Sequence, residues 1–118
     1  MTIDPRALVG VVVKAAEDKK AQDITVLEIS RISVIADYFV IMSGRSSTHV
    51  QAIAEKIMDA LEERAGLVPR REGLREGQWV LLDYGDVVVH IFQESERQFY
   101  NLERLWGDAR VVDVPVNL

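Results

Sequence analysis

The sequence predicts a single α/β domain in which a mixed β-sheet packs against about three helices. Stretches of apolar, β-branched residues alternate along the chain with stretches whose apolar residues recur at helical spacing. A strand, a helix and a strand in that order predict a right-handed crossover between parallel strands. A short turn between two later strands predicts an antiparallel hairpin. The chain has 118 residues, a length typical of one domain.

The first helix is predicted to begin at Asp4 and Pro5, because aspartate can cap a helix and proline is tolerated in its first turn. Two strands are expected next, at residues 23–29 and 37–43. The second has the continuous apolar run of a strand buried on both faces. Residues 31–36 fit either a hairpin connection or a continued strand. The first helix has one apolar stripe, formed by Ala7, Leu8, Val11, Val12, Ala15 and Ala16.

A strand-to-helix turn at residues 44–48 leads into the second predicted helix. Thr48 and Gln51 have the spacing of a capping box, and Gly66 can adopt the backbone conformation that ends a helix. The arginine-rich segment 67–77 is expected to form a short extended piece and a surface loop. The apolar stripe of this helix contains Val50, Ile53, Ala54, Ile57, Met58 and Leu61.

Residues 79–82 and 87–92 are predicted to form two strands joined by a tight turn, in which Gly85 can take a positive φ. A third helix is expected to begin at Ser95, where a second capping box occurs, and to end at Gly107. We therefore place a single domain at residues 1–107. Residues 108–118 should form a tail that is either loose or docked on an edge or a partner.

The composition excludes several classes of protein. The net charge of −5 and the pI of about 5.0 argue against a domain whose main task is to bind nucleic-acid phosphates. The absence of cysteine excludes a disulfide framework and a thiolate metal site. The chain has no apolar run long enough to cross a membrane and does not begin with a signal-peptide pattern. We expect a cytoplasmic protein.

The most enzyme-like feature is the turn Ser43–Thr48. Its backbone amides, hydroxyls and Arg45 could hold a phosphate, yet the Lys-Ser/Thr pair of a P-loop is missing. Nucleotidyltransferases also need clustered carboxylates to hold metal ions. The available carboxylates, Asp37, Asp83 and Asp86, occur singly along the sequence. Helix capping is the favoured interpretation, and a nucleotidyl- or phosphotransferase that uses residues 44–48 is the alternative.

Histidine and arginine give weaker signals. His90 alternates along its predicted strand with Val89 and Ile91 and so shares a face with Val88 and Phe92, and a hydrogen-bonded core or interface histidine is favoured over a ligand. With His49 as the only other histidine, neither a metal site nor a cofactor is expected. One cluster of arginines near the 67–77 loop could touch RNA, although a solvated loop explains it better. These arginines are Arg64, Arg70, Arg71 and Arg75.

Several aromatic residues occur at the ends of predicted elements rather than in their middles. Aromatic side chains are enriched at protein–protein interfaces, because they bury a large area with few rotatable bonds. We therefore expect at least one of them to contact a partner. The four are Trp79, Tyr84, Tyr100 and Trp106.

These motifs together resemble the ribosomal silencing factor family, also called the Iojap family. The resemblance rests on DYFVI at residues 37–41, SGRSSTHV at 43–50, WVLLDYGDVVVHIF at 79–92 and LERLW at 102–106, together with Arg97 and Tyr100. It extends from the first helix to Trp106 and is specific only when the motifs are taken jointly.

The resemblance implies a nucleotidyltransferase-like shape without the active site, and a role that is not enzymatic. Family members bind ribosomal protein uL14 on the large subunit, block subunit joining and repress translation, and they form homodimers when free. Little direct nucleic-acid binding and no membrane are implied. A homodimeric scaffold whose aromatics serve only self-association is a further alternative. The partner-binding residues are expected to be Trp79, Asp83, Tyr84, His90, Tyr100 and Trp106.

Overall fold

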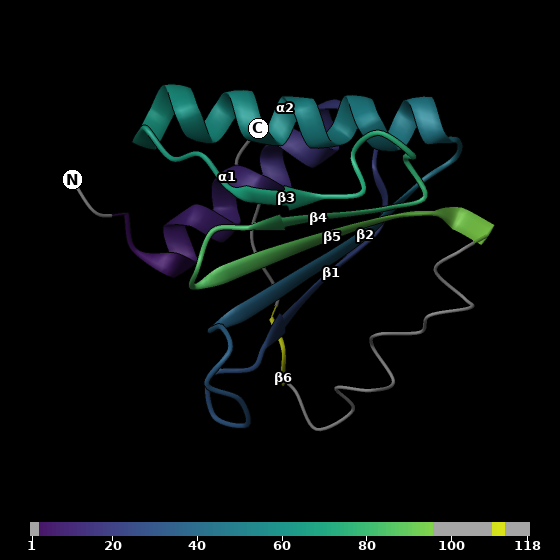
Figure 1. Cartoon of the computed structure of the whole chain (residues 1–118). Helices are drawn as coiled ribbons and strands as arrows, with labels where there is room; N and C mark the ends of the chain where they lie inside the picture. Colours follow the sequence, from purple (N-terminus) through teal and green to yellow (C-terminus); the bar gives the residue numbers. More distant parts are fainter. Residues whose placement is uncertain (1–2, 96–109, 113–118) are drawn as a thin grey trace.

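The computed structural model describes residues 3–95 and 110–112, which form a six-stranded mixed sheet with two helices on one face (Figure 1). This confirms the predicted α/β class. The helices are α1 (Pro5–Asp18) and α2 (Ser47–Ala65). The strands are β1 (Gln22–Glu28), β2 (Tyr38–Gly44), β3 (Arg70–Glu72), β4 (Trp79–Asp83), β5 (Val87–Gln93) and β6 (Arg110–Val111).

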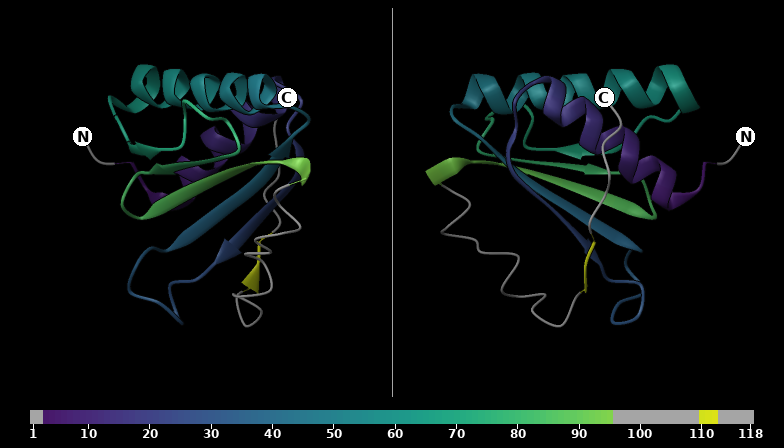
Figure 2. Two further views of the ribbon diagram at one scale, coloured as in Figure 1. Left: turned by 45° about the vertical axis from the view of Figure 1, so that its right-hand side comes forward. Right: turned by 180° about the vertical axis from the view of Figure 1, so that it is seen from behind.

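The strands lie in the order β3-β4-β5-β2-β1-β6. Strands β2 and β5 are parallel, and the other neighbours are antiparallel. The crossover from β2 therefore contains α2, β3 and β4 before the chain returns beside β2. The parallel partner of β2 is the second strand of the β4–β5 hairpin, because β4 takes the place next to the edge strand β3. In the views of Figure 2 both helices remain on the same side of the sheet.

The first half of the chain follows the prediction closely. Helix α1 starts at Pro5 with Asp4 at its N-cap position, as predicted, but the side chain of Asp4 makes no capping hydrogen bond. Strands β1 and β2 are each shifted by one residue from their predicted positions. Residues 31–36 form the connection of an antiparallel hairpin, since the amide of Ile29 donates to the carbonyl of Asp37 at 2.8 Å.

The start of α2 corrects a second capping prediction. The cap is Ser46 rather than Thr48: its backbone is extended and its hydroxyl accepts from the amide of His49 at 3.1 Å. The helix thus begins one residue before Thr48. Gln51 makes no capping box and instead donates to the carbonyls of Leu74 and Arg75 at 3.0 and 2.9 Å. This pair of hydrogen bonds ties the arginine-rich loop to α2.

Side chains are buried on both faces of the sheet. On the helix face, apolar residues of the strands pack against the stripes predicted for α1 and α2. On the opposite face, which we call the second face, a smaller apolar cluster contains Leu27, Ile29, Ala36, Phe39, Ile41, Val88 and Phe92. Every residue of β2 is buried, which confirms the prediction for that strand.

The end of the chain is described only in part. Glu94 and Ser95 are helical, and the remainder of the predicted third helix, with Tyr100 and Trp106, lies outside the described residues. Residues 110–112 lie along β1, where the amide of Val112 donates to the carbonyl of Val26 at 2.8 Å. The predicted domain boundary at residue 107 also lies outside them and stays a prediction. No helix in the described part of the chain is long and apolar enough to cross a membrane.

Candidate functional site

Strand β4 carries polar and aromatic side chains on the second face of the sheet. Its burial alternates, with Val80 and Leu82 fully buried against the helices and the residues between them only partly buried. Alternation with a period of two places Trp79, Leu81 and Asp83 together on the second face. We call these three residues the β4 stripe. They form the accessible margin of the second-face cluster, next to the edge strand β3.

Aromatic rings gather where β4, β5 and β2 meet on this face. The rings of Trp79 and Phe92 stack with their centroids 5.0 Å apart. The rings of Phe39 and His90 meet edge to face at 4.8 Å. Such arrangements match the charge distribution of aromatic rings. The cluster therefore holds the Trp79 ring in one orientation at the margin of the face.

A hydrogen bond joins the two residues of this cluster that the sequence analysis singled out. The indole Nε1–H of Trp79 donates to Nδ1 of His90 at 3.2 Å. Since Nδ1 accepts, the proton of the neutral imidazole is on Nε2. This Nε2 is buried and has no hydrogen-bond partner among the described residues. The sequence predicted a hydrogen-bonded histidine in the core or at an interface. The structure confirms a buried, hydrogen-bonded histidine in which one of the two ring nitrogens has a partner.

The imidazole of His90 is uncharged at neutral pH. Burial lowers the pKa of His90 to about 4, and the negative charge of Asp83 opposes that shift. Burial disfavours a charged imidazole because the surrounding rings cannot solvate it. Within the β4 stripe and His90, the negative charge is therefore that of Asp83, and His90 adds no positive charge.

Asp83 lies at the end of β4 and also shapes the following turn. Its Oδ1 accepts from the amide of Gly85 at 2.8 Å, and Gly85 has the predicted positive φ of 89°. Between Asp83 and β3 the surface is hollowed by about 330 Å³, with Leu81 and Arg71 in the lining. The β4 stripe thus borders a shallow depression into which a partner side chain could fit.

Tyr84 lies apart from the other predicted site residues. It packs against the helix-face core, and its phenol oxygen is buried with no hydrogen-bond partner among the described residues. Burial raises the pKa of Tyr84 well above its usual value. The structure therefore joins Trp79 and His90 directly and places Asp83 on the same face, but it separates Tyr84 from them.

The turn at residues 44–48 lacks the geometry of a phosphotransferase. Its amide at Arg45 already donates to Nδ1 of His49 at 2.9 Å, and the amide of the adjoining His49 donates to the Ser46 hydroxyl at 3.1 Å. The Nε2 of His49 lies 2.7 Å from the carbonyl of Lys19, so both ring nitrogens are used to join the turn to the end of α1. His49 is therefore a structural residue here.

The carboxylates that such an enzyme needs are at the other end of the sheet. Asp37 donates its amide to the carbonyl of Asp86 at 2.7 Å, just before β2 begins, whereas the turn follows its last residue. Six residues of extended chain lie between Asp37 and Gly44, which places the two roughly 20 Å apart. Within residues 3–95 and 110–112 there is no group of three or more side chains able to hold a metal ion.

Two residues of the second face, Phe39 and Leu81, were not singled out from the sequence. Phe39 and Phe92 are buried beside His90, and Leu81 belongs to the β4 stripe. The period of two placed residues 88, 90 and 92 on one face of their strand, and the same period along β2 and β4 is the signal for Phe39 and Leu81. That signal was hidden because β2 and most of β4 are apolar on both faces and show no polar alternation.

Comparisons with known proteins agree on one family. The model of the family described as ribosomal silencing factor during starvation matches residues 2–117. The chain is 46% identical to Ribosomal silencing factor RsfS of Bacillus subtilis over 112 residues, which cover 95% of each protein.

Two crystal structures show the same fold. One is from Bacillus halodurans, with a TM-score of 0.81 and 41% identity, covering 92% of this chain and 98% of that one. The other is from Chromobacterium violaceum, with a TM-score of 0.86 and 30% identity, covering 98% of this chain and 95% of that one.

Proposed function

The chain belongs to the ribosomal silencing factor family, and from this we propose that it represses translation by blocking the joining of ribosomal subunits. In this proposal it binds ribosomal protein uL14 on the large subunit in the cytoplasm and acts by occlusion, without catalysis. The family's name and the relative's name support the silencing role. The separation of the carboxylates from the 44–48 turn supports a role without chemistry.

The β4 stripe is the surface that we propose for this contact. The observation that carries the assignment is the Trp79 ring, which is only partly buried and is fixed by stacking on Phe92 and by a hydrogen bond to His90. A rigid aromatic side chain loses little entropy on binding, which is why tryptophan is common among interface hot spots. Asp83 adds a negative charge that suits a basic ribosomal protein.

The net charge of the chain supports the same partner. With a charge of −5, the protein is attracted to a basic ribosomal protein and repelled by the phosphates of exposed RNA. This attraction raises the rate of association more than the final affinity. We therefore expect binding to weaken as salt is raised, chiefly through a slower association rate.

We propose that the free chain is a homodimer and that Trp79 takes part in the ribosomal contact rather than only in self-association. Concentration-dependent sedimentation of the free protein tests the first part. If a Trp79 variant binds the large subunit normally but no longer self-associates, Trp79 serves the dimer alone.

Replacing Trp79 tests the proposed surface directly. Trp79→Ala removes the anchor and should weaken binding to purified large subunits by at least about thirtyfold, or about 2 kcal/mol. Trp79→Phe is the matched control, because it keeps a stacked ring and should lose much less. Co-sedimentation with separated subunits gives the affinity, and re-association at moderate magnesium gives the block on joining.

Two outcomes contradict the proposal. If the wild-type chain does not co-sediment with large subunits, the silencing role itself is wrong for this protein. If Trp79→Ala is folded, as judged by circular dichroism, and binds as tightly as the wild type, the contact lies elsewhere on the molecule.

A further inference from the structure

A second surface lies between α2 and the segment 67–74, and it shares Arg71 with the depression beside the β4 stripe. It is a groove of about 380 Å³. Apolar side chains line it, and Val68 among them is 72% exposed. An exposed valine beside a groove leaves apolar area in water that a partner could cover. The other apolar lining residues used below are Met58, Leu67 and Leu74.

One side of this groove is a row of carboxylates. Glu55, Asp59 and Glu62 follow each other on α2 at spacings of four and three residues, so they share one flank of the helix, and all three are exposed. Along the part of the chain that the structure describes, none of these three makes an ion pair. The basic side chain in the lining, Arg71, lies 3.7 Å from the sulfur of Met58. The groove thus has an apolar floor and an uncompensated acidic side.

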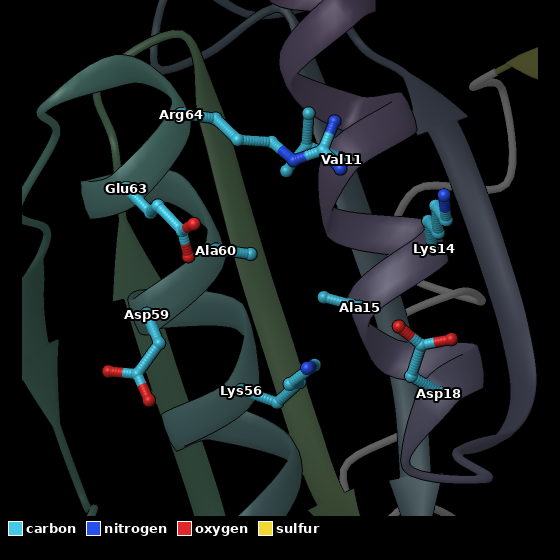
Figure 3. A pocket seen from close by; sticks show the side chains of 9 residues that line it. All are labelled: Val11, Lys14, Ala15, Asp18, Lys56, Asp59, Ala60, Glu63 and Arg64. Atoms are coloured by element: carbon cyan, nitrogen blue, oxygen red, sulfur yellow. The ribbon is translucent and has the colours of Figure 1, made fainter.

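The charges of α2 are sorted between its two flanks. A second groove, between α1 and α2, has a volume of about 350 Å³ and is lined by acidic and basic residues alike. Figure 3 shows Lys56 and Arg64 extending from α2 toward α1, whereas the carboxylate of Asp59 points to the opposite side. The basic residues of the helix therefore lie on the flank facing α1, and the flank facing residues 67–74 keeps its negative charge.

This arrangement is unfavourable for the isolated helix. Carboxylates three and four residues apart repel each other across one turn. Glu62 also lies in the last turns of α2, where the helix dipole favours a positive charge. A cationic partner in the groove would relieve both effects, and a phosphate backbone would worsen them.

We propose that the groove between α2 and residues 67–74 binds a lysine- and arginine-rich peptide segment that carries one apolar side chain, supplied by a basic ribosomal protein. The apolar side chain covers Val68 and enters between Met58 and Leu74, and the cationic side chains pair with the α2 carboxylates. The groove gives the chain a second contact with the large subunit, independent of the Trp79 surface. The ribosomal source of the segment rests on the proposed function, whereas the chemistry of the groove does not.

A synthetic peptide tests the groove without the ribosome. The probe is a twelve-residue peptide of lysine and arginine with one central leucine, titrated into the full-length, isotope-labelled chain by nuclear magnetic resonance. Amide shifts should be confined to residues 55–62 and 67–74. Glu62→Lys should weaken binding at least tenfold, while Glu17→Lys, which changes the net charge equally from an exposed position on α1, should change it less than twofold.

The apolar part of the proposal has its own control. Val68→Ser should weaken the leucine peptide severalfold and leave unchanged the binding of a peptide with serine in place of leucine. Equal losses for Glu62→Lys and Glu17→Lys would reduce the interaction to general charge attraction and overturn the groove. Shifts spread over all acidic surfaces would do the same.

The ribosomal source is tested with the same variants. Glu62→Lys should weaken co-sedimentation with large subunits at least tenfold and leave binding to isolated uL14 unchanged. A variant of the β4 stripe should instead weaken binding to isolated uL14. Unchanged subunit affinity for Glu62→Lys overturns a ribosomal occupant. A wild-type chain that does not co-sediment overturns the proposed function and this source together, and the peptide titration still decides the groove. If Glu62→Lys instead dissociates a dimer of the free protein, the occupant is a second copy and the proposal is wrong.

Discussion

One face of the sheet lies under α1 and α2, whereas the other carries Trp79, Asp83 and His90. On the helix face the strand residues in the core are apolar apart from the hydroxyl of Tyr38. The second face has a smaller apolar cluster and a buried imidazole with one unpaired nitrogen. A buried polar group without a partner costs stability that an apolar side chain of similar size would not. Each face carries one such group, since the phenol oxygen of Tyr84 is also unpaired on the helix face among the described residues. The faces differ in the size of their apolar clusters and in the partly buried side chains of the β4 stripe. We therefore expect the helix face to supply most of the stability, and we propose the second face for recognition.

Neighbouring leucines of β4 provide the strongest test of this comparison. Leu82 is fully buried on the helix face, while Leu81 is partly buried on the second face. Leu82→Ala should lower the free energy of unfolding by about 3 kcal/mol, because it leaves a cavity, and should not change affinity for the large subunit. Leu81→Ala should cost about 1 kcal/mol of stability and weaken binding.

Urea denaturation and co-sedimentation of both variants measure the two effects. If Leu81→Ala lost as much stability as Leu82→Ala and kept full affinity, both faces would be structural and the comparison would fail. Because both variants make the same chemical change at adjacent positions, each serves as the control for the other.

Acid should destabilise the protein through His90 on the second face. The folded state resists protonation until the pKa of about 4, whereas the unfolded chain takes up the proton near its ordinary value of 6.5. The unfolded state thus binds more protons as the pH falls, so the contribution of His90 is complete above pH 6.5 and is lost between pH 6.5 and pH 4. The loss should reach about 2 kcal/mol by pH 5.

Carboxylates titrate in the same range, so the test compares two proteins. The unfolding free energy is measured at pH 7 and pH 5 for the wild type and for His90→Phe. Between these two values it should fall more for the wild type than for the variant. Parallel pH profiles would show that His90 is protonated in the folded state. The imidazole would then be a charged group, and the second face would be more polar than the structure indicates.

Much of the helix face was predictable, because α1 and α2 have regular apolar stripes and Gly66 ends α2 with a positive φ of 66°. The hairpin at Gly85 was predictable from turn chemistry. The place of β5 beside β2 was not, because a helix-containing crossover does not reveal that two further strands follow before the chain returns. Sequence patterns fix the elements more firmly than their order in the sheet.

The residues proposed for the site could be singled out from the sequence, but their arrangement could not. The Trp79–His90 hydrogen bond depends on the register that pairs Trp79 with Phe92 and Leu81 with His90, and one residue of slippage would break it. Tyr84 was grouped with Trp79 because it is aromatic and nearby in sequence. Residues in a turn do not follow the alternation of a strand, and its side chain packs on the helix face instead.

The smallest predicted effect concerns the start of α2, which supports the helix face without belonging to the sheet itself. Ser46→Ala removes the hydroxyl that accepts from the amide of His49 and should cost about 1 kcal/mol of stability. Thr48→Ala, inside the first turn and exposed, should cost less than half as much. Neither change should alter affinity for the large subunit, because both side chains belong to the start of α2 and neither is part of the β4 stripe. Thermal denaturation ranks the two variants, and a larger loss of stability for Thr48→Ala would restore the cap that the sequence pattern favoured.

A fall in subunit affinity for Ser46→Ala at unchanged folding would extend the recognition surface to the helices. The proposed division between a stabilising helix face and a recognition face would then be wrong.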